Sequence, residues 1–296
     1  MRTHKLFIPL FILGSIAACN DDSSRPDVVT MPAPTPAPAP TPEPEPAGPC
    51  EAVACEDNNK VLVVQIYEDI INGGQTGLVD SLFDEDFTQH SEDIMAGIEG
   101  LSSYYDGLLM DNPNHEASVK HIVADGDYVA VHWHYSNAPE DEFTGTAHVD
   151  LFKLFDDQII EMRPYSMTPN AVTASGNSVF SDLYDYGSAR ANNDVQIEED
   201  NKTLVTDFYI EAFNNNNVAL IDNTIDENYI QHNYFVPNGR DALRNFVGNS
   251  PAANISVFLS LAEDDLVWTF RDDAPVVDLW RVDNNTNKIV EHWDVF

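Results

Sequence analysis

The chain has 296 residues, and its 14 basic against 50 acidic side chains give a formal net charge of −36 at pH 7. A field of that sign repels the phosphates of nucleic acids and anionic lipid surfaces, so nucleic acid is excluded as a partner. The acidic residues are scattered along the whole chain, which is typical of a solvating surface rather than of a binding tail.

Residues 1–19 predict export. MRTHKLFIPLFILGSIAAC has two basic residues before an apolar run that begins at Leu6 and is too short to span a membrane. The tetrapeptide that ends at Cys19 resembles the lipobox of bacterial lipoproteins, which implies that Cys19 is lipidated and becomes the mature N-terminus. Ordinary signal cleavage is the alternative. Asn20 is not the aspartate that holds lipoproteins in the inner membrane, so we expect a lipid anchor on the periplasmic side of the outer membrane.

Residues 20–56 predict a disordered tether. The stretch from Pro32 to Pro49 contains nine prolines and favours polyproline II, which gives a spacer of roughly 55 Å at about 3.1 Å per residue. A ligand for a proline-binding domain is the alternative. Cys50 and Cys55 follow, and an oxidising compartment favours a local disulfide between them. Two free thiols are the alternative, and a metal site would need more ligands.

The remainder of the chain contains two copies of one unit. Asn59–His90 aligns without gaps on Asn201–His232, and twelve of the thirty-two positions are identical. Later, DLFKLFDDQIIE matches DLWRVDNNTNKIVE once two residues are inserted. We therefore predict a first domain at 57–166, a linker at 167–198 and a second domain at 199–296, each of an ordinary domain size.

Each copy begins with helices and ends with strands. Apolar residues recur at helical spacing from Leu62 to Ile71 and from Leu204 to Phe213, and a shorter helix is expected at 101–109 and at 241–247. HEASVKHIVADGDYVAVHWHYSN and ISVFLSLAEDDLVWTF predict strand, turn and strand, and the two segments that follow predict closing hairpins. Helices followed by an antiparallel sheet indicate an α+β fold with helices on one face of a strongly curved sheet.

The stretches YIQHNYFVPNGRDAL, VVDLWRV and KIVEHWDVF resemble the SnoaL-like polyketide cyclase and aldol-condensation family of the nuclear transport factor 2-like superfamily. The resemblance is good over Asn201 to Phe296 and weaker over Asn59 to Tyr165. It implies two tandem cone-shaped α+β barrels, each with a pocket between the long helix and the curved sheet. It also implies a carboxylate as general base, with no metal and no organic cofactor.

The candidate site centres on the last strand. Side chains alternate along a strand, so His292 and Asp294 share one face of KIVEHWDVF. The resemblance implies Asp294 as the base, with His292 orienting it or donating to an oxyanion. Other polar groups expected to line the pocket come from the long helix and the QHN stretch: Tyr209, Gln231, His232 and Asn233. Of these, His232 is predicted to be catalytic and the others to bind the ligand. Each of these roles has an alternative. Tyr209 can be a core residue, Gln231 and His232 can cap a loop, and the last strand can be an exposed edge strand.

The first copy departs from this pattern. It has EMRP at 161–164 where the second has EHWD at 291–294, so the base is missing and a proline, which cannot donate a ladder hydrogen bond, stands in its place. We expect a degenerate domain without the same activity. His132 and His134 share a strand face, and His90 and His148 are expected to approach them. Alternating histidines can hold a transition metal, but a polar ligand pocket or a solvated face is preferred, and no metal is predicted.

Two classes of function follow. The first is a cofactor-independent lyase or isomerase of the aldol type, which needs a carboxylate with a raised pKa and a donor for the enolate oxygen. The second is a non-catalytic module that binds a small hydrophobic molecule or a partner protein. Polyketide cyclisation itself is not expected, because those pathways are cytoplasmic and this chain is predicted to be exported. The two domains are expected to pair as an intramolecular pseudo-dimer, and further homo-oligomerisation is left open.

Overall fold

The computed structural model describes Cys50 and residues 53–169, 173–185 and 194–295. The predicted signal peptide, Cys19 and the proline-rich stretch lie outside these residues. A disulfide joins Cys50 to Cys55, and the first helix begins at Val53, inside the range expected for the tether. None of the helices in the described ranges is long and apolar enough to cross a bilayer.

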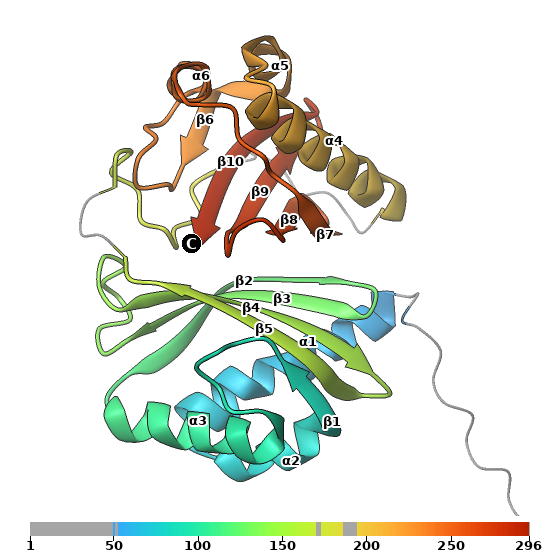
Figure 1. Cartoon of the computed structure of the whole chain (residues 1–296), viewed down its shortest axis with the longest axis vertical. Coiled ribbons are helices and arrows are strands. Elements are labelled where there is room, and N and C mark those ends of the chain that lie inside the picture. The colour runs from blue at the N-terminus through green and yellow to red at the C-terminus, as the bar shows by residue number, and fades with distance from the viewer. Residues whose placement is uncertain (1–49, 51–52, 170–172, 186–193, 296) are drawn as a thin grey trace, which may run out of the picture. The chain divides into compact units, whose positions relative to one another are not determined.

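The first half of the chain folds as helices followed by strands, as the sequence predicts (Figure 1). Its elements are α1 (Val53–Gln65), the π-helical segment η1 (Ile66–Asn72), the 3-10 turn η2 (Thr76–Leu78), α2 (Val79–Leu82), β1 (Phe83–Gln89), α3 (Gly97–Asp111), β2 (Glu116–Asp125), β3 (Tyr128–Ser136), β4 (Thr146–Phe155) and β5 (Gln158–Met167). The first helical stretch ends at Gly73-Gly74, where Gly74 takes a positive φ of 67° that side chains disfavour.

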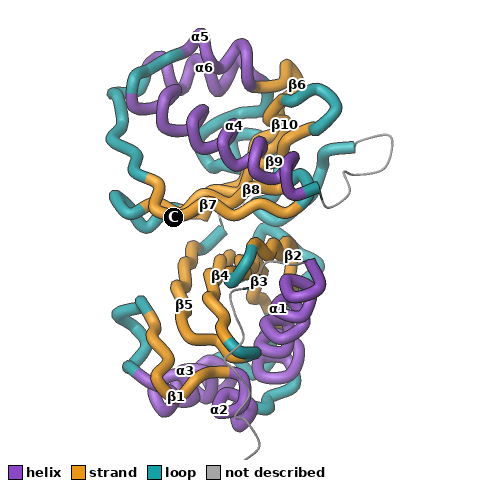
Figure 2. Tube along the Cα trace, turned by 90° about the vertical axis from the view of Figure 1, so that its right-hand side faces the viewer, coloured by secondary structure: helices purple, strands orange, loops and turns teal. Residues whose placement is uncertain are grey.

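The second half repeats this order, and its helices and strands are coloured by type in Figure 2. Its elements are α4 (Val195–Asn214), α5 (Val218–Thr224), β6 (Ile225–Gln231), α6 (Arg240–Asn249), β7 (Val257–Glu263), β8 (Leu266–Arg271), β9 (Val277–Asp283) and β10 (Lys288–Val295). The long helix α4 begins at an N-cap aspartate: the Asp194 side chain accepts hydrogen bonds from the backbone N–H groups of Gln196 and Ile197.

Each half has one five-stranded sheet, and the two sheets share the same topology. The strand order is β1-β5-β4-β3-β2 in the first half and β6-β10-β9-β8-β7 in the second. Four strands form an antiparallel meander, while β1 and β6 lie parallel to β5 and β10. The sheets are therefore mixed, which corrects the expected antiparallel sheet. The acidic sequences FDEDFTQ and IDENYIQ do not predict strands, because several of their side chains remain exposed and the apolar alternation is weak.

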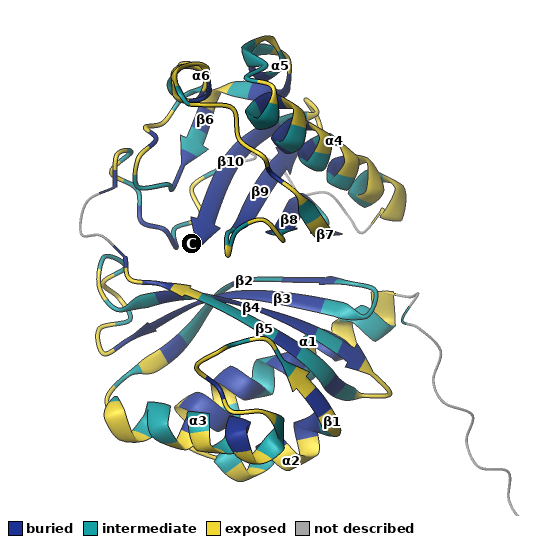
Figure 3. Cartoon of the chain, in the orientation of Figure 1, coloured by how far each residue is buried: buried dark blue, intermediate teal, exposed yellow. Residues whose placement is uncertain are grey.

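In each half, the helices cover one face of the sheet with an apolar core. Phe208 and Tyr209 of α4 pack against Trp280 of β9, with ring centroids 6.1 and 5.2 Å from the tryptophan. Tyr67 of η1 packs against Trp133 of β3 in the same way, at 5.2 Å. Figure 3 shows the buried residues concentrated along the strands and the inner sides of the helices. This face of the second sheet carries the candidate site.

The opposite faces of the two sheets share a further apolar cluster. The described residues of the two halves belong to one compact unit. The cluster includes Val149 and Leu151 from the first sheet, Trp268 and Trp293 from the second, and Phe180 from the segment between them. Burying each such side chain contributes roughly 1.5–3 kcal/mol to folding. The cluster supports the expected pairing of the two copies within one chain.

Candidate functional site

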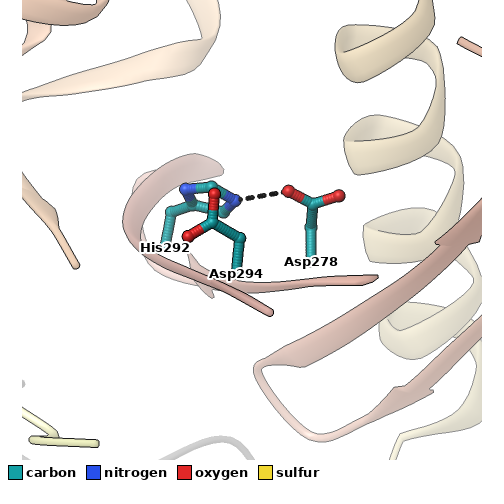
Figure 4. Close-up of side chains that lie close together, drawn as sticks. All are labelled: Asp278, His292 and Asp294. Atoms are coloured by element: carbon teal, nitrogen blue, oxygen red, sulfur yellow. Dashed lines mark hydrogen bonds and ion pairs between the residues drawn. The ribbon is translucent and has the colours of Figure 1, made fainter. Parts of the chain in front are cut away.

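The last two strands place two carboxylates opposite each other. Asp278 of β9 pairs with Asp294 of β10, and Trp280 pairs with His292 in the same register. Opposite residues on neighbouring strands point to the same face, so these side chains lie together under α4. Figure 4 shows the two aspartates and the histidine gathered at one place. The exposed fractions of Asp278, His292 and Asp294 are 3, 6 and 7%, so the last strand is not a solvated edge.

The hydrogen bonds of His292 fix where its protons lie. Its Nδ1 lies 3.0 Å from Oε1 of Gln231, and that oxygen also accepts the backbone N–H groups of His232 and Asn233. An oxygen with these partners can only accept, so Nδ1 carries a proton and donates it. The other nitrogen, Nε2, lies 3.0 Å from Oδ1 of Asp278. That contact holds one proton between the two groups, so the Asp278–His292 couple has no net charge.

Asp294 is a buried carboxylate with one free oxygen. Its Oδ2 accepts a hydrogen bond from Nδ2 of Asn233, whereas its Oδ1 is buried without a hydrogen-bond partner, as is Oδ2 of Asp278. Burial raises the pKa of Asp294 to about 6; the nearby His292 lowers it and Asp278 raises it further. The carboxylate is therefore ionised at neutral pH but remains basic enough to accept a proton.

The three side chains line one end of a cavity of about 360 Å³ between α4, α6 and the sheet. Its polar lining consists of Gln231, Asn233, Arg271, Asp278, His292 and Asp294. Aromatic rings make up much of the remaining wall: Tyr209, Phe213, Tyr229, Phe235, Phe246 and Trp280. Five of the residues predicted for a site in this half thus meet in one cavity.

Arg271 and Tyr209 form a donor chain at this cavity. Nη1 of Arg271 donates to the hydroxyl of Tyr209 at 3.2 Å, and its Nε and Nη2 donate to the two carboxylate oxygens of Asp273. Burial, and then the Asp278 carboxylate, raise the pKa of Tyr209 well above its ordinary value. The hydroxyl therefore keeps its proton at neutral pH and can donate it to an oxygen.

Sequence reasoning missed Asp278 and Arg271. Asp278 stands in the quoted stretch VVDLWRV, and strand alternation places it on the same face as Trp280. Pairing that stretch with KIVEHWDVF in an antiparallel hairpin would have brought it opposite Asp294. Arg271 ends β8, and nothing in its local sequence indicates that it turns toward Tyr209.

His232 does not lie in the cavity, which corrects the predicted catalytic role. Gln231 pairs with His292 across the parallel strands β6 and β10, so the next residue points to the opposite face. There Nε2 of His232 lies 2.9 Å from Oε1 of Glu291, Nδ1 lies 2.5 Å from the Ser178 carbonyl oxygen, and the ring stacks on Trp293. His232 is therefore part of the buried structure behind the site.

The equivalent face of the first half is closed around another carboxylate. Oδ2 of Asp150 accepts hydrogen bonds from the Tyr67 hydroxyl at 2.8 Å and from Nε1 of Trp133 at 2.7 Å. Burial raises the pKa of Asp150 to about 7, although both hydrogen bonds lower it. Where the second half has His292 and Asp294, the register places Met162 and Pro164, as the sequence comparison predicts.

The histidines predicted to line a pocket in the first half do not meet there. His132 and His134 pack on Phe180, on the sheet face opposite Trp133. His90 instead lies 2.8 Å from Glu161 and is partly exposed. His148 stacks on Trp133 at 4.2 Å, on the face of the sheet opposite His132 and His134. Strand alternation showed which histidines share a face, but it did not show which face is the inner one.

A metal ion is a further candidate for the second-half site. Asp278, His292 and Asp294 each offer a ligand atom, and these atoms lie within 4.8 Å of one another. However, both nitrogens of His292 are already engaged, by Gln231 and by Asp278. A metal would have to take Nε2 away from the carboxylate, so the arrangement favours an acid–base site over a metal centre.

The fold is that of a cone-shaped α+β domain, present twice, with a buried acid–base cluster in the second copy. Residues 61–162 match the family model described as SnoaL-like polyketide cyclase, so the first half of this chain is similar to that family. The matched residues lie in the first copy, whereas the stretches that carry the sequence resemblance lie in the second. No curated protein matches the chain.

Solved structures similar to this chain include a SnoaL-like protein from Jannaschia sp. CCS1, with 25% identity, a TM-score of 0.33 and coverage of 38% of this chain and 86% of that one. IdmH from Streptomyces antibioticus has 20% identity and a TM-score of 0.32, with coverage of 36% and 90%. A SnoaL-like protein from Burkholderia thailandensis E264 has 15% identity and a TM-score of 0.33, with coverage of 38% and 97%.

Proposed function

We propose that the second half is a cofactor-independent lyase or isomerase in which Asp294 removes a proton from carbon next to a carbonyl. The observation that carries this proposal is the free, buried Oδ1 of Asp294 at the wall of an apolar cavity. Burial holds its pKa at about 6, so it is ionised at neutral pH yet strong enough as a base to act in general base catalysis.

The surrounding groups suit the charge that develops. When Oδ1 takes the proton, the C–H electron pair forms a carbon–carbon double bond and the carbonyl electrons move to oxygen as an enolate. The Tyr209 hydroxyl, which Arg271 polarises through the 3.2 Å hydrogen bond, is the donor for that oxygen. The Asp278–His292 couple is uncharged as a unit, so it does not repel the enolate as a free carboxylate would.

The enolate then has two outcomes, and the proton balance is the same for both. Its carbon either attacks a second carbonyl, as in an aldol reaction, or takes a proton at another position, as in an isomerisation. In either case Asp294 returns its proton to the product. The first half takes no part in the chemistry, because Met162 and Pro164 stand where the base and histidine would lie.

The location of the reaction is also a proposal. The signal-like segment that ends at Cys19 supports an exported protein with a lipid anchor on the periplasmic side of the outer membrane. The proline-rich stretch supports a spacer between that anchor and the folded part. Labelling with a palmitate analogue, in the wild type and in Cys19→Ser, tests the anchor: label that remains in the variant contradicts it.

Deuterium exchange at carbon tests the reaction without knowledge of the natural substrate. The full chain is incubated in D₂O with a panel of small ketones and aldehydes, and deuterium next to the carbonyl is measured by NMR. We expect exchange with the wild type and a loss of about 100-fold or more in Asp294→Asn. Asp150→Asn, which changes a buried carboxylate of the other half, is the control and should retain exchange. Exchange that persists in Asp294→Asn contradicts the proposal.

A non-catalytic binding module is the second candidate. The aromatic wall of the cavity and its volume of about 360 Å³ favour it, since such a cavity can hold a small molecule whether or not chemistry follows. Ligand binding that is unchanged in Asp294→Asn, together with no exchange in the wild type, would favour this function over the enzyme.

A further inference from the structure

The charges around the second-half cavity leave it with one net negative charge. The Asp278–His292 couple is neutral as a unit, and Arg271 is paired through two nitrogens with Asp273. Asp294 has only the uncharged Asn233 as a hydrogen-bond donor. No cation of the described residues that line the cavity is left without a carboxylate partner, so a bound anion would meet repulsion there.

Two buried carboxylate oxygens in the cavity lack donors. Neither Oδ2 of Asp278 nor Oδ1 of Asp294 has a partner in hydrogen-bond geometry, although the Tyr209 hydroxyl lies near enough to the Asp278 carboxylate to interact with it. Both residues are more than nine-tenths buried and line the cavity. Leaving a buried acceptor without a donor is destabilising, and more so when the group is charged. A ligand that brings N–H donors to these oxygens removes that cost, whereas an apolar ligand does not.

The remaining wall suits an organic cation with an apolar body. Tyr209, Phe213, Phe246 and Trp280 present aromatic rings to the same space. Aromatic faces attract ammonium groups, and the attraction is stronger in desolvated sites. The net charge of −36 on the whole chain acts in the same direction, because a negative field concentrates cations and repels anions.

A metal cation would also be attracted by the net negative charge of the cavity, but it fits the site less well than an organic ammonium group. It would need Nε2 of His292, which is held 3.0 Å from Asp278, and it would leave most of the cavity of about 360 Å³ unused. An ammonium group can donate to Oδ2 of Asp278 without displacing His292, and its apolar body can occupy the aromatic part of the cavity.

We propose that this cavity binds a small protonated amine whose N–H groups donate to Oδ2 of Asp278 and whose apolar body lies among the aromatic rings. This deepens the proposed function, on which it rests for the reaction, by making the substrate a carbonyl compound that carries an ammonium group. The binding stands on different observations, namely the two free oxygens and the charge balance, so the two proposals can fail separately.

Three probes with the same phenyl body test the inference: phenethylamine, 2-phenylethanol and phenylacetate. Their binding to the full chain is measured by calorimetry at pH 8 and low salt. We expect the amine to bind at least about tenfold more tightly than the alcohol, and the anion not to bind. Asp278→Asn should weaken the amine by about tenfold and change the alcohol little. Asp294→Asn, checked for folding by circular dichroism, provides a second variant with the same expectation.

Asp241→Asn is the matched control, because it removes a carboxylate whose side chain is 87% exposed and lies outside the cavity lining; it should leave all three affinities unchanged. An alcohol that binds as tightly as the amine, a preference for phenylacetate or no binding of any probe overturns the inference. The inference is also overturned if the amine does not bind while Zn²⁺ or Mn²⁺ alone binds tightly and His292→Ala abolishes that metal binding. Deuterium exchange without a preference for the amine contradicts this inference but leaves the proposed reaction standing. Amine binding without exchange supports this inference and contradicts the proposed reaction.

Discussion

Asp150 and Asp278 occupy the same position in the two sheets. Asp150 pairs with Val131 on one side and Pro164 on the other, while Asp278 pairs with Thr269 and Asp294. Two residues further along the neighbouring strand, the first half has Trp133 and the second has Arg271. The tryptophan donates to its carboxylate and fills the space, whereas the arginine turns to Tyr209 beside an open cavity. The same sheet position thus carries a carboxylate with a tryptophan donor in one copy and a carboxylate that lines a cavity in the other.

The buried carboxylate of Asp150 in the first half makes the stability of the protein depend on pH. The pKa of Asp150 is raised from 3.8 to about 7 in the folded protein, so the stabilising contribution of its protonated form is fully present below about pH 4 and is lost as pH rises through 7. The loss is on the order of 3–4 kcal/mol. Urea unfolding of the wild type and Asp150→Asn at pH 4 and pH 8 measures it. The variant should lose less stability between these pH values; equal losses would show that Asp150 does not titrate this way.

Replacing the proposed base should stabilise the protein at high pH. The pKa of Asp294 is raised from 3.8 to about 6 on folding, so its contribution is also lost as pH rises, here through 6. Relative to the wild type, Asp294→Asn should gain on the order of 2–3 kcal/mol between pH 4 and pH 8. Thermal unfolding at both pH values is the measurement. A constant difference across the range would contradict a titrating, buried Asp294.

Gln231 is expected to set the basicity of Asp294 through His292. In Gln231→Glu the new carboxylate can still accept from Nδ1 of His292 and from the two backbone N–H groups. It adds a negative charge to a buried cluster, so the pKa of Asp294 should rise by about one unit. The pH profile of deuterium exchange should then shift upward by the same amount. Gln196→Glu, at an exposed position of α4, is the control. An equal shift of the pH profile in this variant would show that the change follows from the net charge of the protein rather than from the buried cluster.

Behind the site, a buried ion network holds the connecting segment to the sheet. Nη1 of Arg281 lies 2.5 Å from both Glu291 and Asp182, and its Nε lies 2.9 Å from Asp265. Glu291 also accepts the backbone N–H groups of Leu183 and Tyr184. Arg281→Met leaves buried carboxylates without their cation, which should cost roughly 3–5 kcal/mol.

The control for that network is Arg244→Met, which breaks an exposed pair with Asp222 and should cost less than about 1 kcal/mol. Urea unfolding measures both variants. If Arg281→Met does not fold, Glu291→Gln should still cost more than Arg244→Met. Equal losses for the buried and exposed pairs would contradict the network.

Periodicity predicted the fold class and the shared face of His292 and Asp294, while the roles of the candidate site residues came from the family resemblance. Alternation alone placed His292 and Asp294 on one face, and the repeat showed that Pro164 replaces the base. The position of His232 could not be predicted because the acidic sequence IDENYIQ of β6 lacks the apolar alternation of a typical strand, so nothing in it indicates that Gln231 and His232 point to opposite faces. His132 and His134 were misplaced because a strand buried on both faces gives no signal for which face meets the helices. Arg271 depends on a tertiary contact with Tyr209 that no local pattern encodes.

The proposed chemistry requires a carboxylate in the second half that is desolvated yet able to exchange its proton near neutral pH. A carboxyl-carbon NMR titration of the full chain, labelled at aspartate, measures this directly, with the Asp294→Asn spectrum identifying the resonance. We predict an apparent pKa of about 6 for Asp294. A resonance that titrates near 4, as for an aspartate in water, would contradict the account.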